Sequence, residues 1–201
     1  MAKRMLDLVL SVTGLIILSP VMLIVALAIL ITMGWPIIYR AERAGRYDKP
    51  FKIAKFRSMR PAGPGETTHH PGNDDPRLTP VGRFIRGSKL DEFPQLVNVL
   101  VGDMSIVGPR PEIIEYAALY TEEEQVILSV RPGITDYASL EFAHFGAILP
   151  KLDPDAMYFE KVWKAKMELR MRYVRERTFW TDIKIIFRTF GAVFPPRRRR
   201  H

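Results

Sequence analysis

Two adjacent carboxylates, Asp91 and Glu92, stand shortly before Pro94 in a stretch that is rich in groups able to do chemistry. An apolar, helix-compatible segment follows them. Proline is tolerated in a first helical turn, because its missing N–H would have no partner there. The sequence therefore predicts that Asp91 is the N-cap of this helix. At that position the helix dipole would favour an ionised carboxylate and attract phosphate.

This pair allows two interpretations. An Asp-Glu sequence at a helix start is an ordinary capping device. Alternatively, an ionised Asp91 can attack phosphorus or hold a metal ion, which makes it a candidate catalytic group and metal ligand. Two constrained arginines favour the second interpretation. Arg110 stands between two prolines and Arg131 precedes Pro132-Gly133, so each guanidinium could grip a phosphate at little entropic cost.

An uncharged run from Leu8 to Tyr39 precedes these groups and is long enough for a membrane helix. As one straight helix it would be about 48 Å long, against a hydrocarbon core of about 30 Å. Pro20 interrupts the run and removes a helical hydrogen bond, while Ser19 can help to satisfy the freed backbone. The sequence therefore predicts a kink at Ser19-Pro20.

Basic residues flank this run on both sides. Lys3 and Arg4 precede it, and it is followed by Arg40, Arg43, Arg46, Lys49, Lys52, Lys55, Arg57 and Arg60. The positive-inside rule then places both ends in the cytoplasm. A kinked helix that enters and leaves through one leaflet, a re-entrant helix, satisfies the length, the proline and the charge together. A single tilted span is the alternative.

Length and composition set the outer limits. The chain of 201 residues is long enough for one domain and a membrane anchor. Its 30 Lys and Arg against 22 Asp and Glu give a net charge of +8, which suits nucleic acid, an anionic membrane or phosphorylated substrates alike. The absence of cysteine excludes a disulfide framework and a thiolate metal site.

The remaining segments predict mostly helices. Alternating basic and apolar residues from Ile37 to Arg60 indicate short strands. Glu112 to Val130 and Met157 to Arg177 are compatible with helices. Phe179 to Phe194 is typical of an amphipathic helix, which fits either a membrane surface or packing against the core. Residues 195–201 are expected to form a disordered basic tail that favours anionic lipid.

The order of these motifs closely resembles the signature of the bacterial sugar transferases, the small monotopic phosphoglycosyl transferases of envelope glycan pathways. The resemblance covers nearly the whole chain. Outside the central stretch it rests on Lys3-Arg4, Asp7, Ser19-Pro20, Arg43, Gly45, Lys55 to Met59, Asp75 to Thr79 and Arg131 to Thr135. It implies an enzyme that moves a sugar 1-phosphate from a UDP-sugar to a polyprenyl (undecaprenyl) phosphate, releasing UMP, as the first membrane step of such a pathway.

The resemblance also implies roles for individual residues. Asp91 would attack the β-phosphorus and carry a covalent phosphosugar intermediate, while Glu92 would assist proton removal from the polyprenyl phosphate. Mg²⁺, coordinated by Asp91 and the donor phosphates, would offset negative charge. Substrate would be bound by Lys55, Arg86, Arg110 and Arg131.

The fold expected is helix-rich α+β. It comprises a re-entrant membrane anchor over residues 1–39, a compact cytoplasmic catalytic domain with interfacial amphipathic helices over residues 40–194, and the tail over residues 195–201. The expected location is the cytoplasmic face of the bacterial inner membrane, in a monotopic arrangement. The expected partners are a UDP-sugar, polyprenyl phosphate and membrane lipids, with no nucleic acid. A homodimer, the sugar, the polyprenyl length and the pathway are left open.

Two residues depart from the resembled pattern. The family commonly has glycine at the place of Asp136. It often has an aspartate three residues before the tyrosine that corresponds to Tyr173, where this chain has Arg170. Both departures lie between Asp136 and Arg172, so the sugar specificity of a relative is not carried over to this chain.

Two other functions explain parts of the sequence. A membrane-surface binding or scaffold protein would account for the charge and the apolar run, but not for Asp91-Glu92 beside constrained arginines. A phosphohydrolase acting on lipid diphosphates would use similar residues with water as the acceptor.

Overall fold

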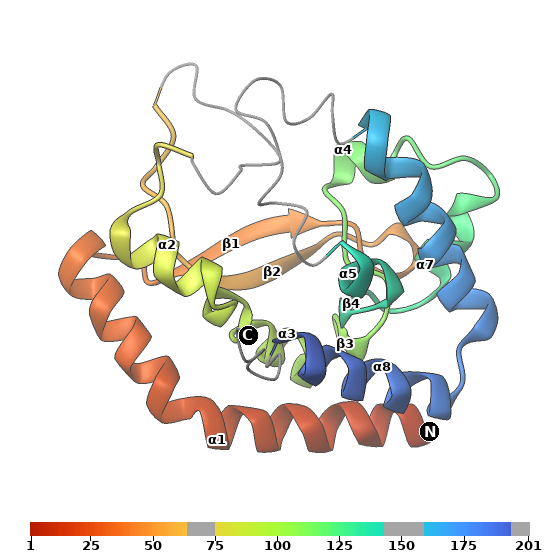
Figure 1. The fold of residues 1–201 in the computed structure, drawn as a ribbon, viewed down its shortest axis with the longest axis horizontal. Coiled ribbons are helices and arrows are strands. Elements are labelled where there is room, and N and C mark those ends of the chain that lie inside the picture. The colour runs from red at the N-terminus through yellow and green to blue at the C-terminus, as the bar shows by residue number, and fades with distance from the viewer. Residues whose placement is uncertain (64–74, 143–158, 194–201) are drawn as a thin grey trace, which may run out of the picture.

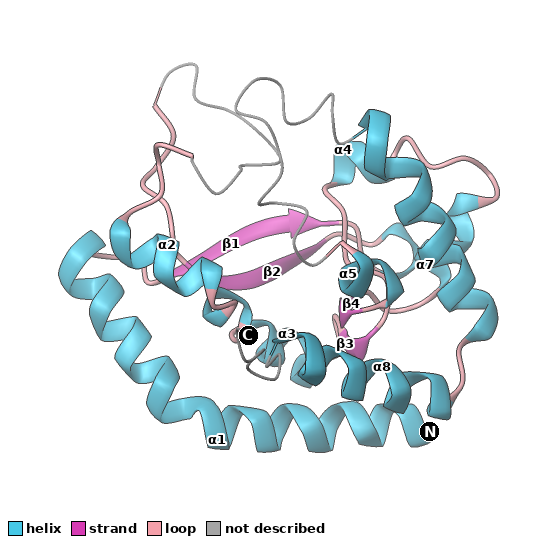
Figure 2. Ribbon diagram, viewed as in Figure 1, coloured by secondary structure: helices cyan, strands magenta, loops and turns pink. Residues whose placement is uncertain are grey.

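The computed structural model describes residues 1–63, 75–142 and 159–193. It confirms a helix-rich α+β fold with a long apolar N-terminal helix (Figures 1 and 2). The predicted tail, residues 195–201, lies outside the described residues. The described elements, with η for the short 3₁₀ and π segments, are α1 (Ala2–Met33), β1 (Ile38–Arg43), η1 (Arg46–Asp48), β2 (Phe51–Phe56), α2 (Pro80–Gly87), η2 (Leu90–Glu92), α3 (Gln95–Val101), β3 (Ser105–Val107), α4 (Ile114–Ala117), η3 (Glu124–Ser129), β4 (Gly133–Thr135), α5 (Tyr137–Glu141), η5 (Phe159–Trp163), α7 (Lys164–Glu176) and α8 (Phe179–Val193).

Helix α1 runs along one side of the molecule and changes direction partway along its length (Figure 1). Pro20 lies inside it and has no N–H to donate to the carbonyl of Ile16, four residues earlier. The Ser19 hydroxyl donates to that carbonyl instead, at 2.8 Å. The proline therefore leaves no unpaired acceptor at Ile16. By length and composition alone, α1 could cross a membrane, and only 11% of its most apolar window is buried.

Both halves of α1 pack against the same domain. In the second half, Ile29 joins Phe56 of β2 and Ile85 of α2 in one hydrophobic cluster. In the first half, a Cβ added at Gly14 would lie 3.1 Å from Leu96 of α3. The rest of the helix surface is largely apolar and exposed, with the side chains of Met5, Val9, Val12, Ile16, Ile17, Leu23, Ile24, Leu27 and Ile31.

A buried carboxylate attaches the first turns of α1 to β3. Asp7 is 3% exposed and accepts hydrogen bonds from Ser105 Oγ at 2.9 Å and from the Ile106 N–H at 3.0 Å. One turn earlier, Lys3 forms an ion pair with Asp182 of α8 at 2.5 Å. The start of α1 is therefore held to the domain by polar contacts, which leaves its apolar residues exposed.

Strands β1 and β2 form an antiparallel pair with Tyr39 opposite Lys55 (Figure 2). The buried amide of Asn98 connects this pair to α3. Its Oδ1 accepts from the Ala54 N–H at 2.9 Å, and its Nδ2 donates to Lys52 O at 2.9 Å. These two bonds set the position of α3, and of the segment that precedes it, relative to β2.

Strands β3 and β4 form a second, parallel pair, with Ser105 opposite Gly133. The two backbones approach closely, since a Cβ at Gly133 would lie 2.1 Å from the nitrogen of Gly108. The Gly133 N–H donates to Pro109 O at 2.9 Å. Only a residue without a side chain allows this approach, which places the turn that carries Arg110 against β4.

One helix prediction is wrong. The chain from Glu112 to Val130 does not form a continuous helix but contains the short α4 and, after a break, η3. Thr121 and Glu124 explain the break. The Thr121 N–H donates to Glu124 Oε2 at 2.8 Å, and the Glu124 N–H donates to Thr121 Oγ1 at 3.3 Å. This reciprocal capping box starts a new turn instead of continuing the previous one.

The two C-terminal helices largely follow the sequence. The helix predicted from Met157 to Arg177 is present as η5 and α7, and its first two residues lie outside the described part of the chain. In α8, Ile185 is fully buried, whereas Trp180 and Phe187 are 76% and 72% exposed. Packing against the core thus accounts for one face of α8 and leaves aromatic side chains exposed. Their contact with lipid stays a prediction.

Replacing Asp7 with alanine tests how α1 is attached. The substitution would leave the Ser105 hydroxyl and the Ile106 N–H buried without their acceptor, so the free energy of unfolding should fall by about 3 kcal/mol. Thermal and denaturant unfolding of the detergent-solubilised protein measures the change. Glu122→Ala removes an exposed carboxylate and serves as the control, with an expected change within about 0.5 kcal/mol. Equal stability of the two variants would contradict this attachment.

Candidate active site

The segment that carries the two carboxylates is a 3₁₀ turn, η2, and not a capped helix start. It follows Lys89, whose φ of 61° is left-handed, and the Glu92 N–H already donates to Lys89 O at 3.2 Å. Helix α3 begins after Pro94 without a side-chain cap. The prediction that Asp91 is an N-cap is therefore wrong. Backbone turns take the N–H groups that a cap would bind, which leaves the Asp91 carboxylate without that structural role.

Two cations hold the Glu92 carboxylate. Arg110 contacts both of its oxygens, with Nη1 donating to Oε2 at 3.0 Å and Nη2 donating to Oε1. Lys55 Nζ lies 3.4 Å from Oε1. Burial alone would raise the pKa of Glu92, but Arg110 and Lys55 together lower it well below its usual range. Glu92 in turn raises the pKa of Arg110. The group is therefore a firmly ionised carboxylate.

Asp91 has the opposite environment. It is 6% exposed, and its buried Oδ1 has no hydrogen-bond partner within the described residues. Burial and the neighbouring Glu92 raise the pKa of Asp91, while the charges of Lys55, Arg86 and Arg110 oppose that rise. The carboxylate therefore lies in the field of three cations with one oxygen free to engage a ligand.

These cations come from three different elements. Lys55 lies on β2, Arg86 in the last turn of α2, and Arg110 in the turn after β3. Burial lowers the pKa of Lys55 and of Arg86, and the nearby carboxylates oppose that effect. Three of the four basic residues predicted to bind substrate are thus gathered around Asp91 and Glu92.

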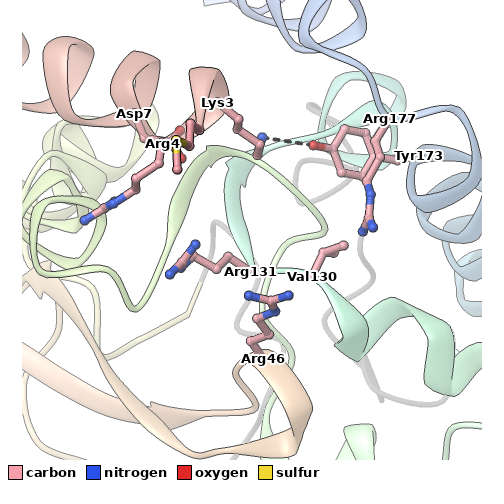
Figure 3. A pocket seen from close by; sticks show the side chains of 9 residues that line it. Lys3, Arg4, Asp7, Arg46, Val130, Arg131, Tyr173 and Arg177 are labelled. Atoms are coloured by element: carbon pink, nitrogen blue, oxygen red, sulfur yellow. Dashed lines mark hydrogen bonds between the residues drawn. The ribbon is translucent and has the colours of Figure 1, made fainter.

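The structure places the fourth, Arg131, elsewhere. Its Nε donates to Gly102 O at 2.8 Å, and Gly102 is the C-cap of α3, whereas Asp91 precedes the N-terminal end of that helix. Arg131 lines a separate pocket beside the start of α1 (Figure 3). A sequence in which arginine precedes Pro-Gly does not reveal toward which end of α3 the side chain points.

Asp136 and Arg170, the two residues that depart from the resembled pattern, lie close to each other, and Asp136 contacts the backbone of Arg110. Asp136 accepts from the Arg110 N–H at 3.4 Å and from the Ser139 N–H at 2.6 Å. Arg170 lies with Nε 4.0 Å from Asp136 Oδ2 and with Nη2 2.8 Å from Glu112 Oε1. Both Asp136 and Arg170 are 0% exposed. The arginine therefore compensates the buried charge that the aspartate adds.

The contact between Asp136 and Arg110 was missed by reasoning from sequence. The sequence signal for this contact was the pair of departures itself, because a carboxylate in place of glycine adds negative charge and an arginine in place of aspartate adds positive charge. The structure gives these residues a position next to the site without contact to either catalytic candidate.

The described residues contain no cluster of three or more His, Cys, Asp or Glu side chains that could by itself hold a metal ion. Magnesium needs no such cluster, since it is commonly bound by one or two carboxylates, with water and substrate phosphates completing its shell. The buried Asp91 oxygen, which has no hydrogen-bond partner in the described part of the chain, has the chemistry of such a ligand. Asp91 therefore fits the predicted magnesium role.

Amide substitutions should affect the two carboxylates in opposite ways. Because the folded-state pKa of Asp91 is raised, its ionisation costs stability at pH values above that pKa. Asp91→Asn should therefore leave the melting temperature at pH 7 unchanged or raise it. Glu92→Gln leaves Arg110 and Lys55 without their carboxylate and should lower the free energy of unfolding by roughly 3 kcal/mol.

The pH dependence provides a further check. The folded-state pKa of Glu92 is lowered, so its contribution is present above the unfolded-state pKa and is lost as the pH falls through the folded-state pKa. The stability difference between Glu92→Gln and the native protein should accordingly shrink on acidification. Unfolding curves at neutral and acidic pH measure it. A destabilised Asp91→Asn beside an unaffected Glu92→Gln would contradict the environments described here.

Comparison with known proteins identifies the family of the chain. Residues 1–196 match the family model described as bacterial sugar transferase. The chain is 38% identical over 190 residues to the UDP-glucose:undecaprenyl-phosphate glucose-1-phosphate transferase of Escherichia coli (strain K12), covering 93% of this chain and 39% of the relative. It thus spans about two fifths of that protein.

Two further relatives differ in length. The sugar transferase EpsL of Bacillus subtilis (strain 168) is 36% identical over 95% of this chain and 86% of its own length. The UDP-N-acetylgalactosamine-undecaprenyl-phosphate N-acetylgalactosaminephosphotransferase of Aeromonas hydrophila is 31% identical over 95% of this chain and 43% of its own length. On the extent of the family match, the chain belongs to the bacterial sugar transferase family.

Proposed function

We propose that this chain transfers a sugar 1-phosphate from a UDP-sugar to undecaprenyl phosphate and releases UMP. Family membership supports this class of reaction, because the Escherichia coli and Aeromonas hydrophila relatives carry names of that chemistry. The observation that carries the proposal is the contrast between the two carboxylates. Asp91 has a buried oxygen with no hydrogen-bond partner among the residues that the structure describes, whereas Glu92 is held by two cations.

The proposed reaction has two displacements at one phosphorus. An Asp91 oxygen attacks the β-phosphorus of the donor, the bond from that phosphorus to the bridging oxygen breaks, and UMP leaves with the electron pair. An oxygen of undecaprenyl phosphate then attacks the same phosphorus and displaces the Asp91 carboxylate, giving the lipid diphosphate sugar. Such covalent catalysis divides one difficult transfer into two easier steps.

Glu92 is proposed to accept the proton of the acceptor phosphate. In the structure its pKa is lowered by Arg110 and Lys55, so the paired carboxylate is a weak base. Donor phosphates compete for the same two cations, because a guanidinium binds phosphate with the fork that it uses for carboxylate. Once these cations turn to substrate, the pKa of the buried Glu92 rises and the carboxylate becomes a better base.

The basic residues around the carboxylates are proposed to bind the donor diphosphate. Lys55, Arg86 and Arg110 give fixed positive charge at the place where negative charge gathers during transfer, and the partly buried setting strengthens that attraction. Magnesium held by Asp91 and the donor phosphates would supply further positive charge. Both effects also keep Asp91 ionised, against the rise in pKa that burial causes.

The identity of the sugar is not part of this proposal. The relatives are named for different sugars, glucose in one case and N-acetylgalactosamine in another. The cations that surround Asp91 would bind the phosphate groups, which all UDP-sugars share. The residues that depart from the family pattern, Asp136 and Arg170, are fully buried, so they do not themselves contact a sugar.

Two alternatives make different predictions. A scaffold protein would have no need of a buried, unpaired Asp91 beside three cations, since such a group lowers stability without a structural return. A lipid-diphosphate phosphohydrolase would use the same residues with water. Release of UMP beyond one equivalent per protein molecule, if it requires both magnesium and undecaprenyl phosphate, distinguishes the proposed transferase from both.

Intact mass tests the covalent step. The detergent-solubilised protein, incubated with magnesium and a panel of UDP-sugars but without acceptor, should gain the mass of one sugar phosphate and release UMP. Asp91→Asn should give no adduct and lose turnover by at least about 10³-fold, because an amide does not attack phosphorus. Glu92→Gln should still form the adduct with impaired transfer. An adduct on Asp91→Asn, or its normal turnover, would disprove the mechanism.

The N-terminal helix is proposed to be re-entrant, with both ends at the cytoplasmic face of the inner membrane. This proposal is supported by the contacts that both ends of the helix make with the domain. Ile29 near one end and Asp7 near the other are both buried against one domain, and a helix crossing the bilayer would have to separate one of these ends from that domain. A bend at Pro20 would cost little free energy in lipid, because the Ser19 hydroxyl donates a hydrogen bond to the Ile16 carbonyl that the proline would leave without a donor.

Cysteine labelling tests the topology. Ala2→Cys and Lys49→Cys place thiols at exposed positions on either side of α1, and a membrane-impermeant reagent added to intact cells should label neither until the inner membrane is opened. Labelling of one site in intact cells would establish a full span instead. A Ser19→Leu/Pro20→Leu double variant should shift the helix toward that span. The conservative Val21→Leu change on the same helix is the control.

A further inference from the structure

A second basic site lies beside the start of α1, apart from Asp91 and Glu92. It is a pocket of about 240 Å³ (Figure 3). Among the described residues, the charged side chains that line it are the cations Lys3, Arg4, Arg46, Arg131 and Arg177 and the carboxylate Asp7. These residues come from α1, η1, the segment before β4 and the end of α7, so the tertiary fold assembles the site from distant parts of the chain.

Most of this positive charge is held in place without being neutralised. Arg4 donates to the carbonyls of Val99 and Leu100 at 2.6 and 3.0 Å. Arg131 donates to a carbonyl of the α3 C-cap, and Arg46 donates to Ser129 O at 3.0 Å. A carbonyl orients a guanidinium but carries no net charge. Three arginines are therefore positioned with their full charges available to a ligand.

The remaining groups leave this excess intact. Lys3 is paired with Asp182, and Asp7 is already occupied by Ser105 and Ile106. Arg177 is exposed, and no hydrogen bond or ion pair involves it in the described part of the chain. Capping of α3 explains the positions of Arg4 and Arg131. It gives no reason for Arg46 and Arg177 to face the same cavity.

We propose that this pocket binds a phosphate ester, and that its source is the headgroup of an anionic phospholipid. The pocket lies against the first turn of α1, a helix that is long and apolar enough to enter a membrane. The fully exposed Met1 lines it, so an apolar side chain is available to the lipid beside the phosphate. Its volume suits a headgroup. Basic pockets beside membrane helices are general binding sites for anionic headgroups. The site is independent of the chemistry at Asp91.

Native mass spectrometry of the detergent-solubilised protein tests the proposal. Titration with phosphatidylglycerol should give one retained lipid, bound at least tenfold more tightly than phosphatidylcholine. Arg46→Gln/Arg177→Gln removes two exposed charges from the pocket and should weaken phosphatidylglycerol binding at least tenfold. Arg83→Gln/Arg175→Gln removes two exposed charges elsewhere and should change it less than twofold. Unfolding curves of both double variants verify that each is folded.

A second arm separates the two sources of phosphate. Inorganic phosphate, followed by its effect on the melting temperature, should compete with phosphatidylglycerol for the native protein. Stabilisation by phosphate that the pocket variant loses, without preference between the two lipids, would keep the anion site and assign it to a soluble phosphate ester. Undiminished lipid binding by the pocket variant, or an equal loss in both double variants, would overturn the proposal. None of these readouts depends on sugar transfer.

Discussion

The interior of this domain is organised by the requirement that buried charges be paired. Beginning at β2, cations and carboxylates alternate through the molecule in a series formed by Lys55, Glu92, Arg110, Asp136, Arg170, Glu112 and Lys166. Arg110 contacts Asp136 through its backbone N–H, and the charge of Asp136 adds to the rise in the pKa of Arg110. The other links are ion pairs between side chains. Removing Glu92, for example, would take the carboxylate away from both Lys55 and Arg110, which costs more than an exposed ion pair contributes. The series thereby connects the catalytic candidates to α7.

Asp91 is the exception to this pairing. It lies next to Glu92 on the same 3₁₀ turn, yet its Oδ1 has no partner in the described residues, and burial raises its pKa. The fold therefore carries a destabilising carboxylate where phosphate chemistry is proposed to occur. Lys55 and Arg110, the two cations that pair with Glu92, also oppose the rise in the pKa of Asp91. Their positive charge therefore reduces the cost of burying the Asp91 carboxylate. A ligand that brings positive charge to the free oxygen would complete the pattern.

Local features of the sequence predicted much of this fold. The apolar run and the strands after it follow from patterns within a few residues, and the order of the motifs placed Lys55, Arg86 and Arg110 near the carboxylates. The re-entrant kink at Ser19-Pro20 stays a prediction. The N-cap at Asp91 failed because a capped helix and a 3₁₀ turn are compatible with the same residues, and a lysine gives no sign of the left-handed backbone found at Lys89. The position of Arg131 depends on the close approach of Gly108 and Gly133, which local patterns do not encode.

The contact between α1 and α3 links the helix proposed to lie in lipid to the candidate active site. Gly14, in the first half of α1, faces Leu96 across a gap too small for another side chain without adjustment, and Leu96 follows Glu92 by four residues. At the C-terminal end of α3, Arg4 binds two carbonyls of the same helix. The short helix that follows the carboxylates is therefore held along its length by the helix proposed to lie in lipid. If α1 lies in lipid as proposed, the same helix that enters the membrane also positions the carboxylates, which would bring a lipid-bound acceptor phosphate close to Asp91.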